Sequence, residues 1–309
     1  MTLELLLQGG LGNQLFQGLA ALNIAKLTDQ ELVINCHWYR RQPESRHEVN
    51  GFRVYELENH PLFSGYRLSY KSRKLVRKAY DLKLPSLHKE LRLVSDYSND
   101  PSIFSQIHPR FVSGYFQTKQ LLDATNINLT DILNLGVYAK IFPTYMQEIQ
   151  ETESIGIHLR LGDYLQDNNF KLISSNYVQI ALYEAFKDLS KTTKLYVFSD
   201  SIDLIYDFFP QIKNLDHILV DPVLFTGMET IHLMAQCQKL ILSHSTFSWW
   251  AGVLATEKGN TVYAPLNEGR TVSSGNFGPE LAISTWIGIS NRPDEIGGVV
   301  GNGKPKSHH

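Results

Sequence analysis

Two polar motifs follow predicted strands and could hold a charged ligand. His158 lies near the end of the predicted strand Ile155–Leu159, and Arg160 and Asp163 follow that strand. Residues two apart in a strand point to the same face, so an imidazole and a guanidinium can converge on one phosphate. Open α/β sheets bind ligands at the carboxyl ends of their strands, which favours a pocket here. The alternative is an ion pair between Arg160 and Asp163 that only stabilises the loop.

The second motif, Leu242–Trp250, also follows a predicted strand and opens a predicted helix. Ser245 or Thr246 can cap this helix, and hydroxyls beside unpaired N–H groups form a cradle for phosphate. Capping alone is the alternative. A hydrolase triad is disfavoured because no glycines flank a nucleophile.

A glycine loop, Gly9–Gly12, separates the first predicted strand from the first predicted helix. The free N–H groups after Gly10 and Gly12, together with the helix dipole, favour an anion, although a simple tight turn is the alternative. A dinucleotide fingerprint needs a third glycine where Leu15 stands and an acid where the next strand ends at Asn35. Nicotinamide binding is therefore disfavoured, whereas Asn13 suits hydrogen bonding to a polyol.

Two carboxylates complete the candidate site. Asp200 follows the predicted strand Lys194–Ser199, and Glu229 lies in the first turn of a predicted helix. Either carboxylate could bind guanine or ribose. The alternative is that Asp200 caps the helix after it and that Glu229 complements the dipole of the helix that it begins. The sequence has no Asp-x-Asp triplet, so we predict no metal site and expect arginine to neutralise phosphate charge.

The elements that must position these residues alternate as strands and helices. Strands separated by helices predict parallel sheets covered on both faces. The 309 residues suit two domains of about 100–200 residues each, and we expect them at 1–145 and 146–290, facing across a cleft, with a flexible tail at 291–309. The predicted strands are Leu3–Gln8, Glu31–Asn35, Ile155–Leu159, Lys194–Ser199, His217–Val220, Lys239–Ser243 and Asn260–Ala264.

Charge and composition exclude several classes of protein. A net charge of −2 and a pI near 6.6 argue against nucleic-acid binding. Residues 67–92 contain nine Lys or Arg against two acids. Within this segment the helical spacing of Leu75, Val76, Ala79 and Tyr80 predicts a basic amphipathic helix. It is either a solvated face or a contact for anionic membrane or a pyrophosphate-linked acceptor.

The two cysteines lie far apart in the sequence, which fits a reducing compartment. Glu4 stands where a signal peptide would be basic, and no apolar run is long enough for a membrane span. We therefore expect a cytoplasmic location.

Four motifs taken together closely resemble the α-1,2-fucosyltransferase family. They occur in family order and are GGLGNQLFQ (9–17), HLRLGDY (158–164), YVFSD (196–200) and SHSTFSWWA (243–251). The piece GYFQ (114–117) is also similar. The resemblance implies a GT-B-like fold, GDP-fucose as donor, inversion at C1 of fucose, no metal, and transfer to O2 of a terminal galactose. The family's Golgi members carry a membrane anchor. We find no such segment in this sequence, so it resembles the bacterial type.

The resemblance also implies roles for individual residues. Arg160 is similar to the arginine that binds the donor pyrophosphate, with His158 beside it, and Asn13 to an asparagine near the transferred sugar. Apart from the resemblance, Asp163 and Asp167 follow Arg160 in the sequence and are the candidates for a general base, with orientation of Arg160 as the alternative role of Asp163. The nucleoside and phosphate contacts implied are Asp200, Glu229, Ser245, Thr246 and Phe247. Two alternatives remain: a glycosyltransferase for another nucleotide sugar or fucose linkage, and a sugar-nucleotide binding protein without turnover.

Overall fold

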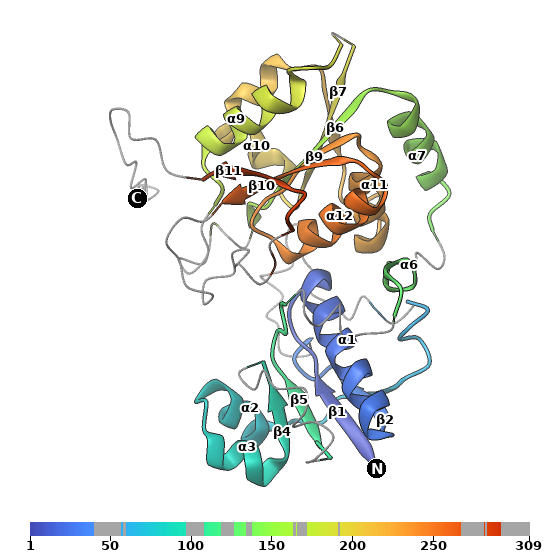
Figure 1. Cartoon of the computed structure of the whole chain (residues 1–309), viewed down its shortest axis with the longest axis vertical. Helices are drawn as coiled ribbons and strands as arrows, with labels where there is room; N and C mark the ends of the chain where they lie inside the picture. The colour runs from blue at the N-terminus through green and yellow to red at the C-terminus, as the bar shows by residue number, and fades with distance from the viewer. Residues whose placement is uncertain are drawn as a thin grey trace, which may run out of the picture.

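The computed structural model contains two β-sheets, one in each half of the chain (Figure 1). It describes residues 1–39, 57, 60–96, 108–118, 127–133, 138–162, 165, 172–190, 192–266, 281 and 283–291. All pairings between the described strands are parallel. The predicted α/β class with two Rossmann-like, GT-B-like halves is therefore confirmed.

The first sheet has the strand order β3-β2-β1-β5-β4. Helix α1 packs on one face, and α2 covers the other face through Val76, Ala79 and Tyr80. The elements of this half are β1 (Thr2–Leu6), α1 (Leu11–Thr28), β2 (Glu31–Asn35), β3 (Arg67–Ser69), α2 (Lys74–Asp81), α3 (Pro85–Leu91), β4 (Leu93–Ser95), β5 (Phe111–Ser113) and α6 (Leu129–Ile132).

The second sheet has the order β11-β10-β9-β6-β7-β8. Helices α9 and α10 cover one face, and α7, α11 and α12 cover the other (Figure 1). Its larger elements are α7 (Phe142–Glu151), β6 (Ser154–Leu159), α9 (Ser175–Phe186), β7 (Lys194–Ser199), α10 (Ile205–Phe208), β8 (His217–Val220), α11 (Gly227–Gln236), β9 (Lys239–Ile241), α12 (Thr246–Glu257), β10 (Thr261–Leu266) and β11 (Ile287–Ser290). Two short 3₁₀ helices, Ile202–Leu204 and Pro210–Asn214, flank α10.

One apolar core joins the two halves. Helix α1 lies between the first sheet and α12, so it is buried on almost all sides. The ring of Phe16 lies 5.1 Å from the ring of Trp249 and 4.8 Å from that of Trp250, measured between centroids. Aromatic pairs at this separation add to the free energy gained by burial. The halves are therefore joined by packing at the N-terminal ends of α1 and α12.

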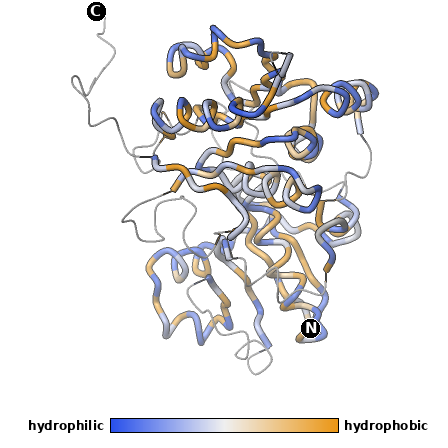
Figure 2. The backbone as a smooth tube through the Cα atoms, turned by 45° about the horizontal axis from the view of Figure 1, so that its top comes forward, coloured by the Kyte–Doolittle hydropathy of each residue, from blue (hydrophilic) through white to orange (hydrophobic). Residues whose placement is uncertain are grey.

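All seven predicted strands are present, with ends shifted by at most two residues. The predicted boundary at residue 145 falls inside α7, which packs on α11 of the second half. The basic amphipathic helix predicted within 67–92 is confirmed as α2, which has one buried apolar face. The same segment also contains β3 and α3, which were not predicted. The tube through this part of the chain alternates between hydrophilic and hydrophobic residues (Figure 2), and in α2 the apolar residues Val76, Ala79 and Tyr80 are buried. Residues 292–309 of the predicted tail lie outside the described residues.

Among the described helices, none is long and apolar enough to cross a bilayer. A cytoplasmic location, and membrane contact through 67–92, stay predictions.

Candidate active site

In the second sheet β7 and β8 follow β6 on one side, and β10 and β11 follow β9 on the other. The strand order therefore reverses between β6 and β9. In an open α/β sheet, ligands bind where the order reverses, at the carboxyl ends of the two strands concerned. The two motifs predicted to bind phosphate follow β6 and β9. The Nδ1 atom of His158, on β6, lies 2.7 Å from Oγ of Ser243, which follows β9. A hydrogen bond therefore ties the two motifs together at the reversal point.

His158 is a neutral member of this site. Its side chain is buried, and its ring packs on Phe247 with 5.6 Å between centroids. Burial lowers the pKa of His158 to about 4; the carboxylate of Asp200 opposes this shift and the charge of Arg160 adds to it. The convergence of His158 and Arg160 on one phosphate stays a prediction, and with a neutral imidazole Arg160 supplies the positive charge.

Arg160 is held by a partner from the next strand. Its Nη1 lies 3.0 Å from Oδ2 of Asp200, directly after β7. The other carboxylate oxygen, Oδ1, accepts hydrogen bonds from the backbone N–H groups of Leu161 (2.9 Å) and Gly162 (3.3 Å). Asp200 thus fixes both the guanidinium and the loop that carries it, and the N-cap of the following helix is Ser201 instead.

The first sheet has its own reversal, between β1 and β5. The glycine loop follows β1, and residues 114–117 follow β5. Oδ1 of Asn13 accepts a hydrogen bond from Nε2 of Gln117 at 2.8 Å. The GYFQ similarity alone predicts no role for Gln117, although its position after a buried strand is a signal for a site residue.

Buried glutamines fix the glycine loop. Nε2 of Gln14 donates to the Gly9 carbonyl (3.1 Å), and Gln17 bonds both the N–H (3.1 Å) and the carbonyl (2.8 Å) of Gln8. Gly10 is the N-cap of α1, and a Cβ added there would meet nothing within 4 Å. The loop is therefore rigid while its surface at Gly10 stays open.

The first turns of α1 and α12 meet. Oγ1 of Thr246 donates to Oδ1 of Asn13 at 3.0 Å, and the indole N–H of Trp250 donates to the Gly12 carbonyl at 3.0 Å. A Cβ on Gly12 would lie only 2.5 Å from the backbone nitrogen of Phe247, so glycine is required here. Oγ of Ser245, the N-cap of α12, accepts from the N–H of Phe247 at 3.3 Å.

The electrostatics of this junction favour an anion. A helix N-terminus carries a partial positive charge, and neither α1 nor α12 has an acidic residue in its first turn. Two positive helix ends in contact repel each other, and a bound anion relieves that repulsion. The structure thus brings together His158, Arg160, Asp200, Gly10, Gly12, Asn13, Ser245, Thr246 and Phe247.

Glu229 lies elsewhere among the described contacts. Its side chain is 1% exposed and forms a capping box with Thr226, whose N–H donates to Oε2 at 2.7 Å, while Oε1 accepts from the N–H of Ala139. These contacts match the helix-end role named as the alternative, and the nucleoside contact stays a prediction. Asp163 lies outside the described residues.

Within the described ranges, no group of three or more His, Cys, Asp or Glu side chains is arranged to hold a metal ion.

Comparisons with known proteins identify the family. A curated relative, the O-antigen biosynthesis glycosyltransferase WbnK of Escherichia coli, is 24% identical over 316 residues, covering 92% of this chain and 99% of WbnK. Among solved structures, the fucosyltransferase NodZ from Bradyrhizobium has a TM-score of 0.43 at 15% identity, covering 82% of this chain and 92% of NodZ. POFUT1 in complex with GDP has a TM-score of 0.43 at 13% identity, covering 85% of this chain and 97% of POFUT1. The model of glycosyl transferase family 11 matches residues 66–289, more than half of the chain. The protein is therefore a glycosyltransferase of family 11, which confirms the family predicted from its four motifs.

Proposed function

We propose that the protein transfers fucose from GDP-fucose to O2 of a terminal galactose, with inversion at C1 of fucose. Three things support the proposal: membership of family 11, the resemblance of the four motifs to α-1,2-fucosyltransferases, and the curated relative in O-antigen biosynthesis. The observation that carries it is the junction of the two helix N-termini beside Arg160.

The proposed chemistry demands that arrangement. The acceptor O2 attacks C1 of fucose from the face opposite GDP, the bond from C1 to the phosphate oxygen breaks, and negative charge grows on the diphosphate. Arg160 and the N–H groups of α1 and α12 are fixed groups that stabilise this charge without reorganising. Asp200 keeps the guanidinium in place, and Asp163 is the proposed acceptor of the hydroxyl proton. We propose that the reaction needs no metal ion.

Asn13 is proposed to position the transferred sugar. Its Oδ1 already accepts from Thr246 and Gln117, one residue from each half of the chain. The amide orientation therefore depends on both halves being in contact. A donor that binds to Asn13 is then positioned by groups from both halves of the chain.

Incubation of the full chain with GDP-fucose and lactose tests the proposal. We expect release of GDP and a fucosyl-lactose whose linkage, determined by NMR, is α-1,2, with unchanged turnover in EDTA. Thermal shifts with GDP and UDP serve as the control for nucleotide choice. Stabilisation by UDP instead of GDP would favour another nucleotide sugar, and GDP binding without transfer would favour a binding protein; either result contradicts the proposal.

A further inference from the structure

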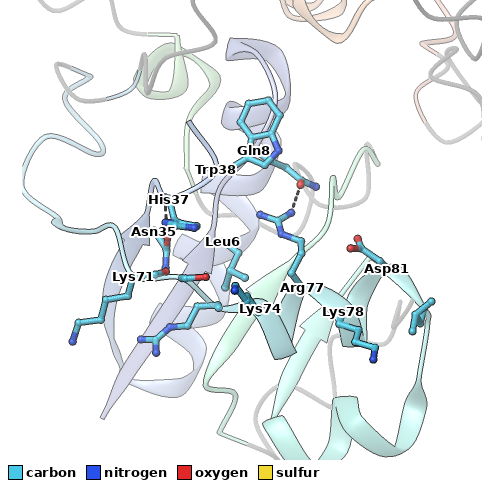
Figure 3. Close-up of a pocket in the computed structure, with 13 residues that line it drawn as sticks. Leu6, Gln8, Asn35, His37, Trp38, Lys71, Lys74, Arg77, Lys78 and Asp81 are labelled. Atoms are coloured by element: carbon cyan, nitrogen blue, oxygen red, sulfur yellow. Dashed lines mark hydrogen bonds between the residues drawn. The ribbon is translucent and has the colours of Figure 1, made fainter. Parts of the chain in front are cut away.

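A second hollow opens beside the glycine loop, on the first half of the chain. The cavity has a volume of about 640 Å³ and lies between the carboxyl ends of β1 and β2 and helix α2 (Figure 3). Five of its lining residues are Lys or Arg and one is acidic. They are Lys71, Arg73, Lys74, Arg77 and Lys78, with Asp81.

The two arginines of this cavity differ in their partners. Arg73 is neutralised by Glu4, with its Nη2 at 2.6 Å from Oε2 and its Nε within 3.1 Å of both carboxylate oxygens. Arg77 donates to the neutral amide oxygen of Gln8 and, among the described residues, forms no ion pair with a carboxylate. In Figure 3 Arg77 lies in the middle of the labelled side chains, whereas Lys71 and Lys78 extend away from it.

Within the part of the chain that the structure describes, the half-buried guanidinium of Arg77 is not paired directly with a carboxylate. Removal of water disfavours its charged form, so burial lowers its pKa, with Asp81 the main opposing influence. A charge that is partly desolvated and not paired costs free energy. An anion bound in the cavity would restore that free energy through the two-pronged geometry of the guanidinium.

Other lining residues suit a sugar. Nδ1 of His37 lies 3.0 Å from the Tyr70 carbonyl, so this nitrogen carries the proton. Nε2 of His37 has no hydrogen-bond partner within the described residues and is closed to water, so a small movement of the ring is needed before it accepts a hydrogen bond from a sugar hydroxyl. Trp38 also lines the cavity and offers an aromatic face for the C–H groups of a galactose ring.

The cavity also adjoins the proposed transfer site. Its wall residue Gln8 directly precedes the glycine loop, and the hydroxyl of Tyr39 donates to the Gly9 carbonyl at 3.0 Å. A ligand in the cavity and a donor at Asn13 would therefore border the same rigid loop.

We propose that this cavity binds the acceptor, and that the acceptor carries a phosphate or diphosphate next to its sugar. Arg77 is the main ligand of the phosphate, and His37 and Trp38 contact the sugar. The identity of the ligand as the acceptor rests on the proposed function. The phosphate could belong to a soluble glycosyl phosphate or to a lipid-linked glycosyl diphosphate, which present the same group to Arg77.

Calorimetry on the full chain with saturating GDP tests this inference. We expect lactose 1-phosphate to bind at least about tenfold more tightly than lactose, with a preference that falls as salt is added. Arg77→Gln should abolish the preference, and Arg77→Lys should retain part of it. Arg67→Gln is the matched control, because Arg67 belongs to the same basic segment but pairs with Glu31 on the exposed edge of the sheet. It should leave the preference unchanged.

The two phosphate sources are separated by kinetics. The ratio of kcat/KM for lactose 1-phosphate to that for lactose measures the soluble source, and a lactosyl diphosphate lipid in detergent micelles measures the lipid-linked one. A preference for either phosphorylated acceptor supports the inference.

Three results would overturn it: equal affinity for lactose and lactose 1-phosphate, equal loss in Arg67→Gln and Arg77→Gln, or binding to phosphatidylglycerol vesicles with no preference in solution. The last result would assign the basic segment to a membrane surface. GDP binding and transfer to lactose report separately on the proposed function, so either proposal can fail while the other stands.

Discussion

The two sheets present different chemistry at their reversal points. In the second half the groups are charged or titratable and are matched within the protein: Arg160 with Asp200, and His158 with Ser243. In the first half the groups are neutral amides and glycines, beside an open basic cavity. Side chains that are fixed by partners within the protein suit a ligand of one defined structure, such as a donor nucleotide sugar. An open cavity suits a ligand whose structure is more variable, such as an acceptor. The donor and the acceptor of the proposed reaction fit this division.

Burial acts on a titratable group in both halves. It lowers the pKa of His158, and it raises the pKa of Asp96, whose Oδ2 accepts from the Tyr115 N–H at 2.7 Å. In each case the neutral form is favoured. The loop that carries Gln117 is thus anchored by a carboxyl group, as the loop that carries Arg160 is anchored by Asp200.

Replacing Arg160 tests the charged side of this comparison and should have the largest effect. We expect Arg160→Ala to lower kcat by on the order of 10²–10³, because a fixed charge on the leaving group is lost. Arg160→Lys should be nearly as damaging, since an ammonium cannot reproduce the two-pronged contact. Steady-state kinetics with GDP-fucose measures both. Arg67→Lys is the control, and near-normal turnover in Arg160→Lys would contradict the role.

A methyl group at Gly12 tests whether the two reversal points must touch. We expect Gly12→Ala to push the first turns of α1 and α12 apart, costing about 1–3 kcal/mol of stability and about 10²-fold in kcat/KM through misplacement of Asn13. Thermal unfolding and kinetics report the two effects. Gly65→Ala, where a Cβ would meet nothing within 4 Å, is the control and should behave as wild type. Full activity in Gly12→Ala would show that the contact is dispensable.

The buried imidazole of the second half should make stability depend on pH. The folded pKa of His158 is about 4 and its ordinary value is 6.5, so only the unfolded chain takes up this proton between those values. The contribution of the neutral His158 to the free energy of unfolding is fully present above about pH 6.5. On the order of 3 kcal/mol of this free energy is lost as the pH falls to about 4. Urea unfolding of wild type and His158→Gln across this range measures it. Parallel pH profiles for the two proteins would rule out the assignment.

The hydrogen bond between the halves should have the smallest effect. Thr246→Val keeps the side-chain shape but loses the donation to Asn13, and one neutral hydrogen bond contributes about 1 kcal/mol. We expect a loss of about fivefold in kcat/KM, whereas Thr246→Ser should stay close to wild type. A similar loss in both variants would point to packing instead of hydrogen bonding.

Local patterns in the sequence predicted most of the fold. The strands Glu31–Asn35, Lys194–Ser199 and His217–Val220 were predicted at their observed limits, because uninterrupted apolar runs mark buried parallel strands. β3, β4 and β5 have three residues each, too short for a period to show, and β11 was also missed. Within 67–92 the helical spacing predicted α2, but Leu75, which was counted with its apolar face, is 55% exposed.

The site was predicted less completely than the fold, because its contacts join distant segments. Arg160 forms an ion pair with Asp200, which follows another strand, and spacing along the sequence does not show this contact. The nearby Asp163, which the spacing suggested as a partner, lies outside the described residues. Gln117 reaches Asn13 across 104 positions. By contrast, the local role of Glu229 was available in the sequence, since Thr226 lies three residues before it, as a capping box requires.

The bond from the Trp250 indole to the Gly12 carbonyl spans 238 positions. Contacts this distant form late, because chain entropy must be lost before they are gained. During synthesis the first half therefore exists with the ring of Phe16 uncovered until both tryptophans have emerged from the ribosome. A chain that ends before α12 would therefore leave the Phe16 face of α1 without the two rings that cover it.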